Sequence, residues 1–78
     1  MEPTPLEVEI RRRIGDKDGE AYALNNLARL RREQGELAEA EKTSRQARRI
    51  CEELKARANG AQARRILAEI LFDQGRAA

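Results

Sequence analysis

Apolar residues recur along the chain at steps of three or four positions, the spacing of one face of an α-helix. The first such run predicts a helix over residues 5–14, where Leu6, Ile10 and Ile14 follow one another at four-residue steps. The Thr-Pro pair at positions 4 and 5 suits a helix start, because threonine caps the first turn and proline fits its first position. Glycine and aspartate between residues 15 and 19 end this helix with turn chemistry.

Three longer runs follow the first. Their apolar stripes predict helices over residues 19–34, 37–57 and 60–74. Only Gly35 and Glu36 separate the second predicted helix from the third, so these two helices must turn back on each other as an antiparallel hairpin. The Asn59-Gly60 pair is expected to interrupt the chain between the third helix and the fourth.

The composition favours an all-α fold. Helix-forming residues dominate the 78 positions, and aromatic residues make up only 3%. The chain has no histidine and one cysteine, Cys51, which rules out an internal disulfide and leaves no residues for a zinc site or for Ser-His or Cys-His catalysis. We therefore expect no enzyme activity, no metal and no cofactor, and we expect Cys51 to pack as a small apolar residue.

The chain also repeats itself. A shift of 40 positions places residues 61–78 on residues 21–38, with identical residues at seven of the eighteen paired positions. The same shift pairs Ile10 with Ile50 and Ile14 with Leu54, so the correspondence extends into the preceding helix. An internal period of this length indicates a solenoid of stacked helical hairpins.

Two segments of the repeat resemble a known family. The segments 23–28, Ala-Leu-Asn-Asn-Leu-Ala, and 34–41, Gln-Gly-Glu-Leu-Ala-Glu-Ala-Glu, are similar to the tetratricopeptide repeat (TPR) of the long-helix kind found in kinesin light chains and LGN/Pins proteins. The resemblance implies one TPR-like domain over residues 1–78, or a fragment of a longer array of repeats. In it, 5–14 end a partial repeat, 19–57 form a full repeat, and 60–78 begin a truncated one.

TPR arrays hold peptides in a concave groove lined by the first helices of their repeats, and the resemblance therefore implies a peptide-binding surface on the helix 19–34. Asn26 is the sharpest candidate, because an asparagine at this position in the family lies against the ligand main chain. A solvated polar face is the alternative interpretation, to which we give equal weight. The candidate residues lie off the apolar stripe: Tyr22, Asn25, Asn26, Arg29, Arg32 and Glu33.

Charge is unevenly distributed along the sequence. Residues 1–40 hold seven basic and nine acidic residues, whereas residues 41–78 hold nine basic and five acidic ones. A basic stripe along the third helix favours acidic peptides as partners over nucleic acid, because the aromatic residues that stack on bases are scarce. The stripe consists of Lys42, Arg45, Arg48, Arg49, Lys55 and Arg57.

No apolar run is long enough to cross a membrane, and residues 1–10 lack the pattern of a signal peptide, so we expect a cytoplasmic protein.

The fourth predicted helix carries large apolar residues but has no following helix to cover them, which favours self-association. A symmetric dimer through this helix and an end-to-end stack, with residues 6–14 of one copy on residues 60–74 of the next, both satisfy this expectation. The sequence thus predicts a protein-interaction scaffold, with a self-assembly module as the alternative. The residues expected at the self-association surface are Ile66, Ile70, Leu71 and Phe72.

Overall fold

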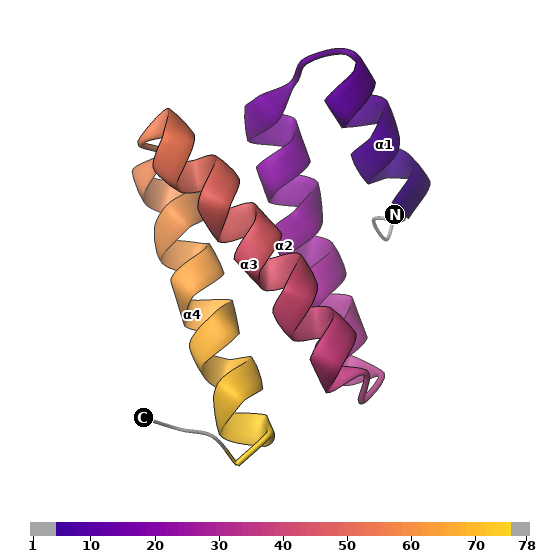
Figure 1. The fold of residues 1–78 in the computed structure, drawn as a ribbon, viewed down its shortest axis with the longest axis vertical. Coiled ribbons are helices and arrows are strands. Elements are labelled where there is room, and N and C mark those ends of the chain that lie inside the picture. Colours follow the sequence, from indigo (N-terminus) through magenta and orange to yellow (C-terminus); the bar gives the residue numbers. More distant parts are fainter. Residues whose placement is uncertain (1–4, 76–78) are drawn as a thin grey trace.

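The structure is a computed structural model that describes residues 5–75. It contains four helices: α1 (Pro5–Arg13), α2 (Lys17–Glu33), α3 (Leu37–Leu54) and α4 (Arg57–Asp73). Consecutive helices run antiparallel and are joined by short turns (Figure 1). The predicted all-α fold of hairpins stacked as a short solenoid is confirmed. The predicted cap at Thr4 and the last three residues of the truncated repeat lie outside the described residues.

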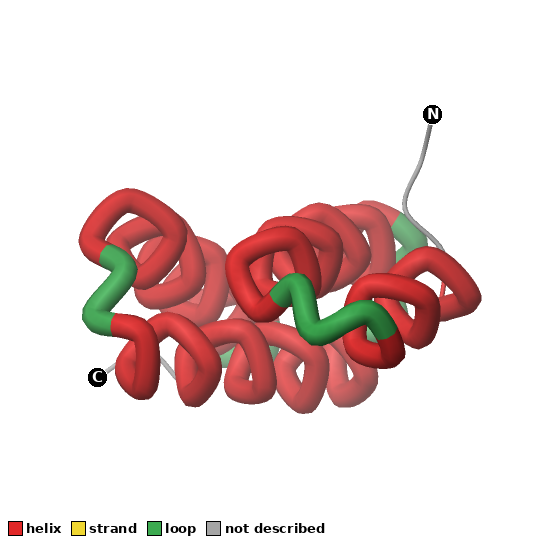
Figure 2. The backbone as a smooth tube through the Cα atoms, turned by 90° about the horizontal axis from the view of Figure 1, so that it is seen from above, coloured by secondary structure: helices red, strands yellow, loops and turns green. Residues whose placement is uncertain are grey.

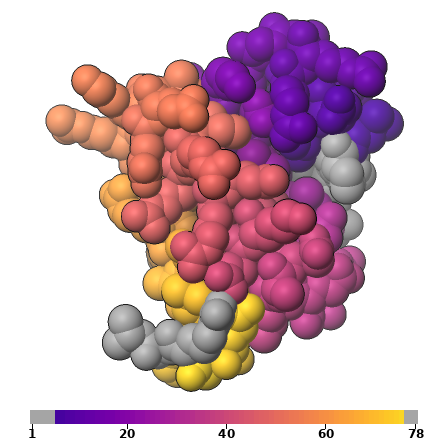
Figure 3. Space-filling model, in the orientation of Figure 1, coloured from indigo at the N-terminus to yellow at the C-terminus, as the bar shows by residue number. Residues whose placement is uncertain are grey.

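The helices form a layered arrangement. α2 and α4 lie in one layer, and α3 lies across them on one side (Figures 1 and 2). α3 packs on both α2 and α4, α2 also packs on α4, and α1 packs on α2 alone. In the space-filling view α3 runs across the front of the molecule, between α4 and the α1–α2 pair (Figure 3). α1 and α4 are therefore the outer helices of the solenoid.

The boundary between α3 and α4 differs from the prediction. α3 ends at Leu54 and α4 begins at Arg57, so Asn59 and Gly60 lie within the first turn of α4 instead of interrupting the chain. Gly60 is buried against α3, and a Cβ added there would lie 3.5 Å from the Cβ of Cys51, which is an ordinary van der Waals distance. An alanine would therefore fit at this position.

The turns recur every twenty residues. At each one a residue takes the left-handed conformation that favours glycine: Gly15 (φ 76°), Gly35 (φ 81°), Lys55 (φ 54°) and Gly75 (φ 73°).

The start of α2 also differs from the prediction. α2 begins at Lys17, two residues earlier than predicted, because the Asp16 side chain accepts a hydrogen bond from the Gly19 backbone N–H at 2.9 Å and caps the helix there.

Small residues dominate the core. One cluster joins Val8 of α1 to Leu24, Leu27 and alanines of α2, α3 and α4, and a second joins Ala28 and Ala40 to Ile66 and Ile70. Cys51 is buried, as expected for a small apolar residue. Alanine at the contacts allows the helix axes to come close together, which suits a fold with few large side chains.

The prediction that Ile66 and Ile70 of α4 are uncovered is wrong. Both side chains are buried, because α4 packs on α2 as well as on α3. Leu71 is half-buried, and only Phe72, at 71% exposure, is open to solvent as predicted.

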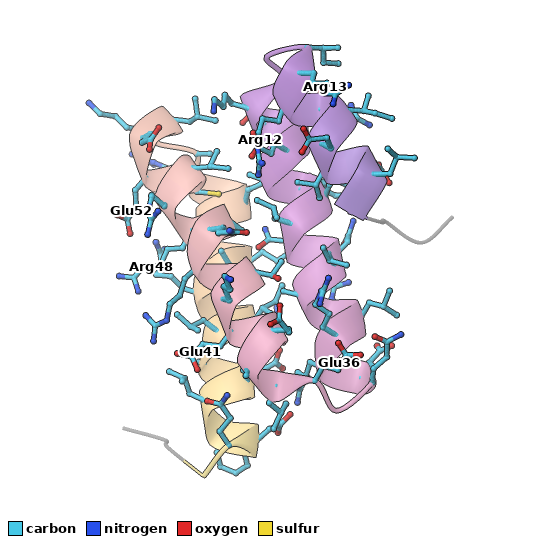
Figure 4. The ribbon with its side chains drawn as sticks, turned by 45° about the vertical axis from the view of Figure 1, so that its right-hand side comes forward. Arg12, Arg13, Glu36, Glu41, Arg48 and Glu52 are labelled. Carbon is cyan, nitrogen blue, oxygen red and sulfur yellow. The ribbon has the colours of Figure 1, made fainter. Side chains whose placement is uncertain are left out.

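Ion pairs attach α1 to α2. The Nε of Arg12 donates a hydrogen bond to Glu20 at 3.0 Å, and Arg12 reaches toward α2 in Figure 4. Arg11 bonds Asp16 at 2.8 Å. Glu20 is buried, so its pairing with Arg12 offsets the cost of placing a carboxylate in the interior.

Candidate protein-binding groove

A groove of about 590 Å³ runs between α2 and α4. From α2 it is lined by Arg29, Arg32 and Glu33. From α4 it is lined by Ala58, Ala61, Gln62, Arg65, Ile66 and Glu69. No residue of α3 lines this groove, so it opens on the face of the α2–α4 layer that α3 does not cover.

One end of the groove is closed by a charged contact between its two walls. The Nε of Arg32 donates to Oδ2 of Asp73 at 2.6 Å, and a second nitrogen lies 3.7 Å from Glu69. The bond to Asp73 raises the pKa of the Arg32 guanidinium above its ordinary value. Arg32 therefore joins α2 to α4, and its positive charge is already opposed by the carboxylates of Asp73 and Glu69.

Two other guanidinium groups in the groove are not neutralised. Arg29 on α2 and Arg65 on α4 are both exposed, and neither has an acidic partner within residues 5–75. The Gln62 amide and the small apolar surface of Ala58 and Ala61 line the same groove. This arrangement can bind a carboxylate from both walls, since each guanidinium presents a planar fork of donors.

Comparison with known proteins identifies the family. The sequence model of the tetratricopeptide repeat matches residues 7–53 and, in a second placement, residues 19–78. The chain belongs to the tetratricopeptide repeat family. No curated protein and no solved structure matches it. TPR repeats are non-catalytic modules that mediate protein–protein interaction, and in this TPR protein the groove lies between α2 and α4.

The six candidate residues of α2 divide between three environments. Arg29, Arg32 and Glu33 line the groove. Tyr22 is exposed and Asn26 is half-buried, and neither lines it. Contact of these two residues with a peptide stays a prediction.

The expectation that Asn25 faces the groove is corrected by its burial. Its Nδ2 donates to the backbone carbonyl of Asn59 at 3.2 Å, and its Oδ1 has no hydrogen-bond partner. The physical reason is that α2 is the central helix and packs on α1, α3 and α4. A position off the α3-facing stripe is therefore still covered, by α4.

The residues of α4 that line the groove were missed in the sequence. Under the 40-residue shift, Gln62 and Arg65 are the equivalents of Tyr22 and Asn25, two of the residues predicted to bind a peptide. The internal repeat therefore contained the information needed to predict them. Applying the candidate positions of the first repeat to the second repeat identifies both.

The basic stripe predicted on α3 is partly neutralised. Arg45 bonds Glu41 at 3.0 Å, and Arg48 bonds Glu52 at 2.9 Å, both between residues four positions apart. Figure 4 shows Glu41, Arg48 and Glu52 on the side of α3 turned away from α2. These bonds reduce the attraction of α3 for acidic ligands and leave the groove as the better candidate site.

Residues 5–75 hold neither a cluster of metal ligands nor a membrane-spanning helix. No group of acidic residues and cysteine in this part of the chain is arranged to hold a metal ion. None of the four helices combines the length and the apolar character needed to cross a membrane.

Proposed function

We propose that this TPR protein is a scaffold that binds an acidic segment of a partner protein in the α2–α4 groove. The observation that carries the proposal is the pair Arg29 and Arg65, which stand on opposite walls of one groove without acidic partners among the described residues. A ligand carboxylate that meets both arginines contacts two repeats at once. Binding would therefore depend on the relative position of α2 and α4.

The neighbouring groups set further conditions on the ligand. Glu33 adds a negative charge on the α2 side, next to Arg32, whose own charge is matched by Asp73. An acidic ligand is thus favoured beside Arg29 and Arg65 and disfavoured toward Glu33. A bond between a guanidinium and a carboxylate contributes about 1.5–3 kcal/mol where solvent is partly excluded.

Selection from a random peptide library displayed on phage tests the proposal. We expect enrichment of peptides rich in Asp and Glu, and at least about a tenfold loss of affinity for them in R29A and in R65A. R49A is the matched control, because Arg49 is an exposed arginine on α3, outside the groove. Equal affinity of R29A, R65A and wild type for the selected peptides contradicts the proposal, as does an equal loss in R49A.

Self-association is a second candidate function, which a separate observation favours. Leu6, Ile10 and Ile14 of the α1 segment are 67%, 50% and 69% exposed, and Phe72 is exposed on α4. Large apolar side chains thus lie open at both outer helices of the solenoid. A structural role in assembly needs apolar surface of this kind.

A further inference from the structure

The exposed apolar residues of the α1 segment form one stripe. Leu6, Ile10 and Ile14 are spaced four positions apart, and Val8, which faces the core, is the buried apolar residue of α1. α1 packs on α2 alone, so within residues 5–75 no element covers the stripe. Burial of three such side chains is strongly favourable, which makes the stripe a docking surface in need of an occupant.

The internal repeat indicates what kind of helix fits this stripe. Under the 40-residue shift, Ile10 and Ile14 correspond to Ile50 and Leu54 of α3. Ile50 packs against the core cluster that contains Leu24 and Leu27 of α2. The equivalent partner of the α1 stripe is therefore a helix of the α2 kind, the first helix of a TPR repeat.

α4 is a helix of that kind with the matching surface open. Ala21, Leu24 and Ala28 of α2 are buried, whereas their equivalents on α4, which are Ala61, Arg64 and Ala68, are all exposed. Leu24 and Ala28 belong to the two core clusters that include alanines of α3. The exposed face of α4 thus corresponds to the face of α2 on which α3 packs.

A hollow of about 480 Å³ lies at this face, where α3 and α4 meet. Three residues that line it, Arg48, Ala61 and Arg64, are the equivalents of Val8, Ala21 and Leu24, which are buried. In the first repeat α3 packs beside these residues, and a smaller hollow of about 250 Å³, lined in part by Val8 and Leu24, remains between α1, α2 and α3. The hollow is therefore the place that a helix of the α3 kind would occupy.

One pair of charges is complementary across the two surfaces, in a hollow whose lining is otherwise mainly basic, with Arg48, Lys55 and Arg57 beside Arg64 and Glu52 as the one acid among the lining residues. Leu24 of α2 and Ala47 of α3 belong to one core cluster. The 40-residue shift converts this apolar pair into Arg64 of α4 and Glu7 of α1, an arginine and a glutamate. Arg64 has no acidic partner among residues 5–75. The opposite charges favour contact between α1 and α4.

α1 and α4 cannot make this contact within one chain, because they lie at opposite edges of the molecule with α2 and α3 between them (Figure 1). We propose that α1 of one copy docks on α4 of a second copy, with Ile10 and Ile14 entering the hollow and Glu7 facing Arg64. The proposal rests on the self-association function and specifies its geometry. Copies related in this way stack head to tail, and their α2–α4 grooves join into one continuous surface.

The stack differs from a symmetric dimer in a measurable way. Each copy uses two different surfaces, so the interface is heterologous and growth is open. We expect the average mass of the wild-type protein to rise continuously with concentration in sedimentation equilibrium. A wild-type protein that stays monomeric up to millimolar concentration, or a mass that stops at the dimer, overturns the proposal.

Two blocked variants test the pairing of surfaces. I10E places a charge on the α1 stripe, and R64E opposes Glu7 with a second acid, so each should weaken self-association at least about tenfold. I10E keeps its α4 surface and R64E keeps its α1 surface. An equimolar mixture of the two should therefore form a heterodimer and grow no further.

The controls separate this geometry from other causes. R49E makes the same charge change as R64E at an exposed position of α3, outside the proposed interface, and should associate like wild type. E7R/R64E restores an opposite-charge pair at the interface and should regain the association that R64E loses. Circular dichroism of each variant establishes that the helices are intact. Association of I10E alone, absence of a heterodimer in the mixture, loss of association in R49E, or failure of E7R/R64E to recover it overturns the proposal. Because no peptide is present, these results do not depend on the groove function.

Discussion

Lys55 is the one residue other than glycine with a positive φ among the described residues, and its replacement by glycine should stabilise the protein. It occupies the turn position that glycine holds at residues 15, 35 and 75. The hydrogen bonds at this turn are those of the other turns: the Ala56 N–H donates to Cys51 O at 2.9 Å, as the Glu36 N–H donates to Arg31 O at 2.9 Å. The backbone therefore takes the same path with a side chain present.

The expected gain follows from two opposing terms. A residue with a Cβ in the left-handed region costs about 1–2 kcal/mol, a cost that glycine avoids. Glycine loses about 0.4–1 kcal/mol more conformational entropy on folding. K55G should therefore raise the free energy of unfolding by about 0.5–1 kcal/mol, which corresponds to an increase in Tm of about 2–8 °C for a domain of this size. The ammonium group of Lys55 makes no ion pair within residues 5–75, so its removal adds no further cost.

Urea denaturation followed by circular dichroism measures the change, with G35A as the matched control. A Cβ added at Gly35 meets no atom within 4 Å, so the cost of this substitution arises from backbone strain alone. We expect G35A to lose about 1 kcal/mol and K55G to gain, with the same dependence on urea as wild type. If K55G is no more stable than wild type while G35A is destabilised, Lys55 is not strained and the reasoning fails.

Three further predictions concern capping and buried groups. The Gly19 backbone N–H and the Arg11 guanidinium hold the pKa of Asp16 below its ordinary value of 3.8, so the ionised carboxylate stabilises the fold above that pH and loses this effect as the pH falls. In urea titrations D16N should be less stable than wild type at neutral pH, with the difference shrinking toward about pH 3. N25A should lose about 1–2 kcal/mol in the same assay, because a buried bond to a main-chain carbonyl of α4 is removed, and unchanged stability would contradict the assigned burial of Asn25. Burial raises the pKa of the Cys51 thiol, so its reaction with an aromatic disulfide reagent should be slow in the native protein and accelerate across the urea transition.

The sequence predicted the elements that depend on local pattern. Four helices and the tight α2–α3 turn follow from apolar spacing and from Gly35, and both agree with the structure. The α3–α4 turn was placed too late because Lys55 carries no turn signal, whereas Asn59 and Gly60 do. Gly60 lies buried in the first turn of α4, and a linear pattern does not distinguish a glycine inside a helix from one that breaks the chain.

The candidate site could be predicted only in part, because burial in a solenoid depends on neighbours in two directions. Asn25 of α2 is covered by α4, and Ile70 of α4 is covered in turn by α2, because the two helices pack on each other. An amphipathic pattern identifies one apolar face for each helix. The same pattern does not predict a second packing contact that a helix makes through small or polar residues. Arg29 was predicted because it lies off the apolar stripe, and it lines the groove because neither α3 nor α4 buries it.

α4 ends in the same way as α2 and, like α2, has a face that matches a helix of the α3 kind. The Gln74 N–H donates to Ile70 O and the Gly75 N–H to Phe72 O, which repeats the pattern in which Gln34 and Gly35 end α2. At the end of α2 this cap directs the chain into α3, which then covers α2. The same pair of bonds also ends α1, where the Ile14 N–H donates to Ile10 O and the Gly15 N–H to Arg12 O, so the cap does not select the partner. What matches a helix of the α3 kind is the exposed face of α4 formed by Ala61, Arg64 and Ala68. Because α1 corresponds to α3 in the 40-residue repeat, a second copy carries such a helix.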